Sequence, residues 1–457
     1  MSKRSKAGAR IRAWGAQALP SVLSATTLPE PWRKRARPKV KRPLEYSLLY
    51  TATLCLLAIG AVMVYSASSA ESLLNTGDPA YYLKRYVAYG LCGLAALHFI
   101  SRRGPGTVKA MTAPLLALSF VLTAALMLPG IGVTVNGAKR WLGAGPLQFQ
   151  PSELLKLSLV LYAAQLLAAR PARLKTLGGL CKPLLIVVAV ACALLMAEPD
   201  MGTAIVVCAS IAVLLFAAGA RPRHLLGLAG ALFLVGMVAA LVEPYRRARL
   251  TSFLDPWADA ADSGFQAVQA MIAIGSGGLF GVGLGESVQK IFYLPEAHTD
   301  MILAILAEEV GLVGVIAVAA LYGMIAYAGL RAAKAARDRY SKLLATGITA
   351  LILCQAIVNL FAVVGMAPLT GVPLPFISYG NSNLIVMMAG MGMLLNISMT
   401  RGRVPARASL GSRRRERSPA IRTAAGRKET DAASADRRRR NSGSRGARAG
   451  DRGRAAG

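Results

Sequence analysis

The sequence predicts an all-α, polytopic membrane protein with about ten transmembrane helices, a long outer loop between spans seven and eight, and disordered basic cytoplasmic tails. Two observations carry this prediction. Hydrophobic residues make up 54% of the 457-residue chain, above the roughly 45–50% of soluble domains, and they gather in stretches of about the 20 residues that cross a bilayer. The charge of the segments between these stretches also alternates along the chain, as in membrane proteins.

The ten spans are expected to be helices. Lipid cannot satisfy the polar backbone groups of an open strand, and no stretch shows the alternation of a membrane β-barrel. The spans are residues 46–66, 81–100, 110–129, 153–170, 182–197, 201–219, 224–242, 301–329, 343–366 and 378–399. The six cysteines lie in or beside these spans without a CxxC pair, so we expect neither disulfides nor metal ligands.

Basic residues set the expected orientation. Of the net charge of +31, residues 1–45 contribute 12 basic against 2 acidic side chains, and residues 401–457 contribute 18 against 5. Most remaining cations follow even-numbered spans, so that side, with both termini, is expected to be cytoplasmic. A uniformly basic, soluble nucleic-acid binder is excluded, and we expect no nucleic-acid partner.

Three parts follow from this pattern. Residues 46–399 form the expected membrane domain, whose first span lacks a small-residue cleavage site and should stay as an anchor in the cytoplasmic membrane. Residues 1–45 and 400–457 are tails rich in Arg, Ala, Ser and Gly, a composition typical of disorder. The tails either meet solvent and lipid headgroups or dock a cytoplasmic partner.

The outer loop of residues 243–300 is far longer than an ordinary connection, which indicates a function. It holds basic residues around Arg246, an apolar piece at 265–274 and the glycine-rich run 275–285. That run lacks the Gly-Lys-Ser/Thr ending of a phosphate-binding loop and follows no strand, so nucleotide binding is not expected. Flexible backbone beside a re-entrant helix is the favoured interpretation.

Acidic residues stand where this loop enters the eighth span. From local pattern alone, Thr299 or Asp300 is favoured as a helix cap over a site residue. Glu308 and Glu309 follow eight or nine residues into the span, where carboxylates are costly and are functional or paired by default. On helical spacing, Glu308 faces nearer the Asp300 side.

A second cluster lies between spans three and four. Lys139 and Arg140 are cations on the side where positive charge is scarce, which favours anion binding over a topological role. Trp141 suits an interfacial anchor equally well. Glu153 and Lys156 are three residues apart on one helix face and either form a structural ion pair or contribute to a site.

A third cluster, residues 368–383, contains three prolines and two glycines that force an ordered, non-helical outer loop. Ser378 is expected to open the last span, and the polar end of the loop, with Gly380, to line a cavity. Gln355 and Asn359, at i and i+4 on the ninth span, either face this cavity or bond neighbouring helices.

The three clusters, in this order along ten predicted spans, resemble the motifs of the SEDS family (shape, elongation, division and sporulation). The resemblance covers about residues 45–399. The matching stretches are 139–141 with 150–157, 198–203, 293–300 with 308–309, and 371–382. Residues 293–300 and 245–247 are more similar to the division branch than to the elongation branch. The family usually reads Tyr-Gly-Gly-Ser-Ser from position 379, whereas this chain has Asn381 and Asn383, so only Ser378 and Gly380 of this segment are taken as site residues.

The resemblance implies a peptidoglycan glycosyltransferase that polymerises lipid II, a polyprenyl diphosphate-linked disaccharide-peptide, outside the cytoplasmic membrane at the division septum. It implies that Asp300 is catalytic. It further implies a class B penicillin-binding protein transpeptidase as partner, with other division proteins. The expected substrate-binding residues are Lys139, Arg140, Trp141, Glu153, Lys156, Arg246, Glu296, His298, Thr299, Glu308, Ser378 and Gly380.

The expected reaction moves a glycan from its polyprenyl diphosphate to the 4-hydroxyl of the next sugar, with Asp300 as the base. Lys139, Arg140 and Arg246 are the expected cations for the departing diphosphate. A divalent cation such as Mg²⁺ is an option, although the sequence shows no dedicated metal-ligand set. Three rival functions stay open: a lipid II flippase or transporter using the intramembrane glutamates, an elongation polymerase, and a non-catalytic scaffold.

Overall fold

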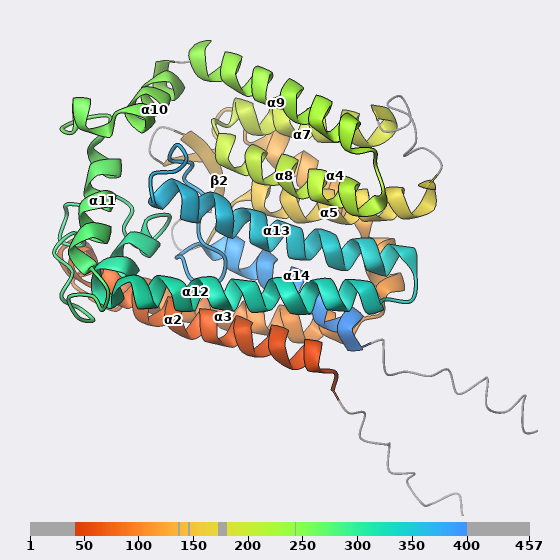
Figure 1. Cartoon of the computed structure of the whole chain (residues 1–457), viewed down its shortest axis with the longest axis horizontal. Helices are drawn as coiled ribbons and strands as arrows, with labels where there is room; N and C mark the ends of the chain where they lie inside the picture. Colours follow the sequence, from red (N-terminus) through yellow and green to blue (C-terminus); the bar gives the residue numbers. More distant parts are fainter. Residues whose placement is uncertain (1–41, 136–137, 145–146, 172–180, 243, 400–457) are drawn as a thin grey trace, which may run out of the picture. The chain divides into compact units, whose positions relative to one another are not determined.

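The computed structural model describes residues 42–135, 138–144, 147–171, 181–242 and 244–399. Helices dominate it, and each of the ten predicted spans coincides with a helix (Figure 1). These helices are α2 (Leu44–Thr76), α3 (Tyr81–Ser101), α4 (Pro105–Ala125), α5 (Pro151–Ala169), α7 (Ile186–Ala197), α8 (Met201–Ala218), α9 (Pro222–Val242), α12 (Ile302–Ala335), α13 (Arg339–Val363) and α14 (Asn381–Met399). A π-helical turn, η3 (Cys181–Leu185), leads into α7. Seven of the ten helices are long and apolar enough to cross a membrane, so the chain is a multi-pass membrane protein.

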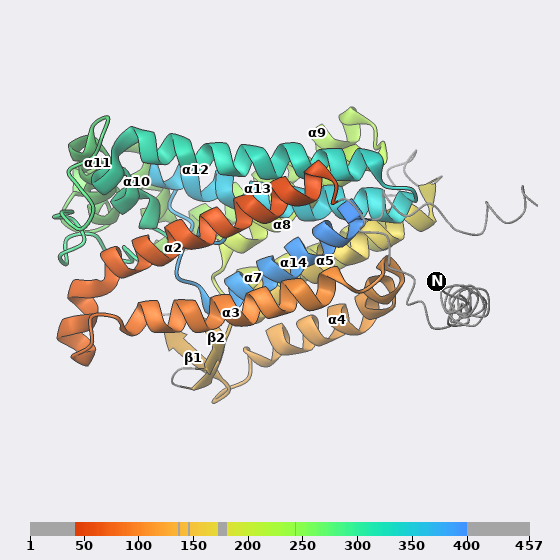
Figure 2. The same cartoon turned by 90° about the horizontal axis from the view of Figure 1, so that it is seen from below.

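The helices pack around a continuous apolar core. α12 lies between α2 and α13 (Figure 1), while α3 packs along α14 (Figure 2). Fully buried side chains such as Leu56, Leu159 and Ile325 belong to this core. At the edge of the bundle (Figure 1), α9 contacts α8 and, more extensively, the segment that follows it at residues 244–254. Phe233 of α9 is 70% exposed, as suits a helix that faces lipid.

The start of α2 and the end of α14 lie at one end of the bundle, and α10 and α11 lie at the other (Figure 1). That arrangement follows from an even number of spans. The long connection between α9 and α12 holds α10 (Pro244–Leu254), a short 3₁₀ turn η4 (Pro256–Asp259), and α11 (Phe265–Gly277). The predicted fold class, with its long loop between spans seven and eight, is confirmed.

The glycine-rich run after α11 folds back against a break in α12. The N–H groups of Val282 and Gly283 donate to the carbonyls of Glu308 and Glu309, at 2.9 and 3.1 Å. Gly311 interrupts the helix with a φ of 74°, and a Cβ there would lie 2.4 Å from the nitrogen of Gly281. Glycine is required at Gly311 because two backbone segments meet there and φ is positive.

A small antiparallel sheet, absent from the sequence prediction, lies in the outer segment between α4 and α5. Its strands, in the order β1-β2-β3, are β1 (Gly132–Val135), β2 (Ala138–Ala144) and β3 (Leu147–Phe149). A register shift between Val133 and Thr134 interrupts the β1–β2 ladder. The sheet presents Lys139, Arg140 and Trp141 together on β2.

Candidate active site

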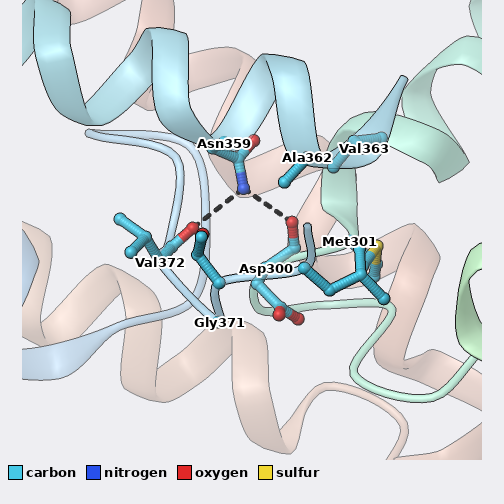
Figure 3. Close-up of a pocket in the computed structure, with 9 residues that line it drawn as sticks. Asp300, Met301, Asn359, Ala362, Val363, Gly371 and Val372 are labelled. Carbon is cyan, nitrogen blue, oxygen red and sulfur yellow. Dashed lines mark hydrogen bonds between the residues drawn. The ribbon is translucent and has the colours of Figure 1, made fainter. Parts of the chain in front are cut away.

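Asp300 lies immediately before α12, but it does not cap that helix. The N-cap residue is Met301, whose side chain makes no capping hydrogen bond in the described structure. The favoured cap interpretation for Thr299 or Asp300 is therefore wrong. Asn359 of α13 instead fixes the Asp300 backbone, because its Nδ2 donates to the carbonyls of Asp300 at 2.7 Å and Val372 at 2.9 Å (Figure 3).

The Asp300 carboxylate points away from Asn359 (Figure 3), and Asp300 is one of the residues that line a small pocket. The pocket is a small hollow between the start of α12, the end of α13 and the loop at 369–372, with about 150 Å³ of space that is partly open to solvent. Asp300 Oδ2 lies 3.9 Å from where a Cβ on Gly371 would stand.

Burial and neighbouring charges shift the pKa of Asp300. Burial, and then the Glu296 carboxylate, raise the pKa of Asp300 to about 7, and Arg249 opposes this rise. The Thr299 hydroxyl joins the two acids, since its Oγ1 donates to Glu296 Oε2 at 2.6 Å and lies 3.4 Å from Asp300 Oδ1. A carboxyl group with a pKa near 7 can accept a proton at neutral pH and hold it strongly enough for general base catalysis.

Arg249 is the cation of this site that the sequence analysis missed. It lies on α10, and its Nη1 donates to the carbonyl of Leu369 at 3.1 Å, which ties α10 to the loop beside Asp300. Its spacing of one helical turn from Arg246 was the available signal. Arg246 lies in α10 as well, but its side chain is outside the described residues.

Glu153 and Lys156 form a buried ion pair, and each is 1% exposed. Lys156 Nζ lies 3.0 Å from Glu153 Oε1 and donates to Gln355 Oε1 at 2.8 Å. Asn383 Nδ2 donates to Glu153 Oε2 at 2.7 Å, and Gln355 Nε2 donates to the carbonyl of Pro373 at 2.8 Å. The network links α5, α13 and α14 to the loop that borders Asp300.

The loop from 366 to 380 is held from several sides. Tyr86 Oη and Tyr322 Oη each donate at 2.5 Å, to the carbonyls of Phe376 and Pro375 respectively. Ser378 does not open the last helix as predicted: α14 begins at Asn381, because Ser378 Oγ accepts the N–H of Leu374 at 2.8 Å within the loop. The carbonyl of Gly380 accepts the N–H of Leu384 at the start of α14, at 2.9 Å.

Of the β2 residues, Arg140 is occupied by protein groups and Lys139 is exposed. Arg140 donates to the carbonyl of Glu198 at 3.1 Å and to that of Pro199, so it fastens the sheet to the turn between α7 and α8. Trp141 is partly buried. Burial raises the pKa of Glu198 to about 8, and within the described residues its carboxylate has no hydrogen-bond partner, so it is largely neutral at pH 7.

Both intramembrane glutamates are engaged by the folded-back loop. Glu308 accepts from Ser287 Oγ at 2.5 Å and from the N–H of Val288 at 3.1 Å. Glu309 pairs with Lys290 at 2.8 Å and accepts from Ser66 Oγ of α2 at 2.6 Å. These contacts anchor the loop and give both carboxylates partners, so the paired alternative of the sequence analysis describes them.

The described residues contain no group of three or more His, Cys, Asp or Glu side chains placed to hold a metal ion. His298 is buried between Tyr82 of α3 and Tyr379 of the loop before α14. Glu296 is exposed at the outer rim. The structure thus brings Glu296, Thr299 and Asp300 into one site, and places Glu153 and Lys156 in a buried support of that site.

Comparison with known proteins identifies the family. The model of the cell cycle proteins FtsW, RodA and SpoVE matches residues 46–403. The chain belongs to this family. The SEDS resemblance is therefore confirmed over essentially the whole membrane domain.

Relatives and solved structures agree with this assignment. Stage V sporulation protein E of Bacillus subtilis is 40% identical over 77% of this chain and 96% of its own length. A Geobacter sp. protein named "Probable peptidoglycan glycosyltransferase FtsW" is 41% identical over 75% and 94%. One chain of a peptidoglycan synthase complex that coordinates polymerization and crosslinking aligns with a TM-score of 0.65 at 30% identity, over 77% and 97%. RodA of Thermus thermophilus aligns with a TM-score of 0.57 at 29% identity, over 78% and 97%.

Proposed function

We propose that this chain is a peptidoglycan glycosyltransferase that polymerises lipid II at the outer face of the cytoplasmic membrane, for septal synthesis in cell division. Relatives named FtsW support the activity. The observation that carries the mechanism is Asp300, a carboxyl group with a pKa of about 7 that lines a small hollow and whose backbone is fixed by Asn359.

In the proposed step the 4-hydroxyl of one sugar attacks the anomeric carbon of the next. The new O4–C1 bond forms as the bond from C1 to the diphosphate breaks. The hydroxyl proton passes to Asp300, and the bonding electrons leave with the polyprenyl diphosphate. Direct displacement inverts the anomeric centre, so an α-linked donor gives a β-linked strand.

The departing diphosphate needs positive charge. Arg249, whose charge acts on Asp300, supports this role, whereas Arg140 is held by backbone carbonyls. Lys139, exposed on β2, stays a proposed helper, as does Arg246. The described residues offer no cluster of metal ligands, so a divalent cation would be carried by the substrate's own phosphate oxygens, where it would neutralise charge on the leaving group.

Partners and location are also part of the proposal. A class B penicillin-binding protein would crosslink the strands, with other division proteins around it, and the septum would be the site of action. The similarity to a chain of a synthase complex that couples polymerization to crosslinking supports such a partner. Both termini are proposed to be cytoplasmic, which agrees with the start of α2 and the end of α14 lying at the same end of the bundle (Figure 1).

The activity is tested with the purified full-length protein in detergent and labelled lipid II, with the partner added if required. Wild type should form polymer, and Asp300→Asn should lose on the order of 10²-fold or more of the rate. Asp262→Asn, in an exposed turn of the same loop, is the matched control and should keep wild-type activity. If folded Asp300→Asn polymerises at the wild-type rate, the base assignment fails.

The division role needs a separate test in cells. Depletion of a division polymerase makes cells filament, whereas depletion of an elongation polymerase makes them round. Filaments are expected here, and round cells would move the chain to the elongation role without changing its chemistry. A transporter or scaffold would form no polymer in detergent, where no transport can be measured.

A further inference from the structure

Four aromatic side chains from three segments meet near the loop that carries Asp300: two from the start of α3, one from that loop and one from the loop before α14. Tyr82 is the centre of the group. Its ring centroid lies 4.3 Å from His298, 5.0 Å from Tyr379 and 5.3 Å from Tyr81. His298 is two residues before Asp300, and its carbonyl accepts the N–H of Tyr379 at 3.0 Å, so the group is joined to the backbone of the catalytic loop.

The rings are arranged as a corner. The planes of Tyr82 and Tyr379 meet at 79°, and those of Tyr82 and Tyr81 at 81°. His298 is 7% exposed and forms the floor, while the three tyrosines are partly exposed. Burial lowers the pKa of His298, so the floor is a neutral ring at pH 7.

Carboxylates dominate the rim of this corner. Glu71 Oε2 at the end of α2 lies 3.5 Å from His298 Nδ1, and Glu296 also acts on the His298 ring. Arg85 is the nearby cation, with its guanidinium 4.9 Å from the centroid of Tyr81. Because two carboxylates and one guanidinium surround the rings, the local charge repels a diphosphate. We therefore expect the diphosphate to bind on the Arg249 side of Asp300.

We propose that Tyr82, Tyr379 and His298 form a subsite for a neutral N-acetylated hexosamine ring of the glycan, on the side of Asp300 away from the diphosphate. This inference rests on the proposed function. A pyranose ring offers an apolar C–H face that packs on a tyrosine ring and a hydroxyl edge that bonds to carboxylates. Aromatic walls with a few polar groups at the rim are the usual lining of a small-ligand site.

An interfacial aromatic belt would place the rings differently. Belt residues turn their rings toward lipid headgroups, whereas these rings contact one another in tilted and edge-to-face pairs, one of them on the loop that carries Asp300. Tyr65 of α2, at 43% exposure, has no such partner among the ring contacts of the described residues and serves as a matched control.

The test is the steady-state kinetics of lipid II polymerisation by purified full-length variants, with strand length as a second readout. Tyr82→Ala should raise KM on the order of ten-fold and shorten the strands, with kcat changed less than about three-fold. Tyr82→Phe keeps the ring and should therefore raise KM less than Tyr82→Ala does. Tyr65→Ala should match wild type.

Lipid II binding is then measured for each variant in an Asp300→Asn background, which separates binding from turnover and confirms folding. The dissociation constant of Tyr82→Ala should rise as its KM does. A wild-type KM for Tyr82→Ala, with polymerisation intact, would overturn the subsite. So would loss of stimulation by the transpeptidase at unchanged KM, which would mark a protein-binding surface. Absence of polymer from the wild-type protein would instead contradict the proposed function.

Discussion

Asn383 Nδ2 donates a 2.7 Å hydrogen bond to Glu153 Oε2, across 230 residues of sequence. The other oxygen of this carboxylate, Oε1, pairs with Lys156, so both oxygens of Glu153 have a donor. The pairing matters because Glu153 is only 1% exposed. The family's usual serine at this position is shorter than asparagine. The departure at 383 is therefore explained by a direct bond to a buried charge, and that bond sits in the network that supports the loop beside Asp300.

Asn383→Ser should destabilise the protein, because it leaves one oxygen of a buried carboxylate without its donor, at a cost of roughly 1–3 kcal/mol. Asn383→Asp should be worse, since it sets a second carboxylate against Glu153. Thermal unfolding in detergent measures both. Asn381→Gly, the family residue two positions earlier, should change the melting temperature little; equal losses for Asn381→Gly and Asn383→Ser would contradict this account.

Gly371→Ala should reduce turnover about ten-fold. Its φ of 68° is costly for a side chain, by roughly 1–2 kcal/mol, and the added methyl group would stand 3.9 Å from Asp300 Oδ2, where the sugar hydroxyl must come. Gly77→Ala is the matched control, because Gly77 has a φ of 72° with open space around it. If both variants polymerise lipid II equally well, proximity to Asp300 has no effect on activity.

Lys290→Met should destabilise the folded protein by roughly 3–5 kcal/mol, because it leaves the buried Glu309 carboxylate without its cation. Adding Glu309→Gln should recover part of this loss. Lys84→Met is the control: its 2.7 Å pair with Asp78 is exposed to solvent and should contribute little to stability. Melting temperatures in detergent compare the three. A Lys290→Met loss no larger than the Lys84→Met loss would mean that the pair does not hold the loop.

The membrane helices were predictable because each apolar stretch matches the thickness of the bilayer and each basic loop marks a side. The sheet of β1–β3 was not, because its longest strand has seven residues and pairs only within the outer segment. The local pattern also wrongly assigned Asp300 as a helix cap. The contact that fixes the Asp300 carbonyl comes from Asn359, on a helix more than fifty residues later in the chain.

The partners of the buried charges were equally hidden. Glu153 and Lys156 have the spacing of a helical ion pair, which the structure contains, but the groups that complete it, Gln355 and Asn383, lie about 200 residues away. Lys290 was overlooked as the counter-ion of Glu309 because the sequence gives no sign that the loop folds back along α12. Contacts of this range depend on tertiary packing and leave no periodic signal.

The pH dependence of kcat/KM for lipid II polymerisation tests the central claim, that Asp300 accepts the proton, most directly. Its raised pKa means that the carboxyl is protonated below about pH 7 and cannot act as a base there. The rate should therefore fall about ten-fold per unit below pH 7 and level off above it. Glu296→Gln removes a charge that raises the pKa, so its acidic limb should move to lower pH. A wild-type profile that is flat between about pH 5 and 8, or an acidic limb unmoved in Glu296→Gln, would contradict Asp300 as the base.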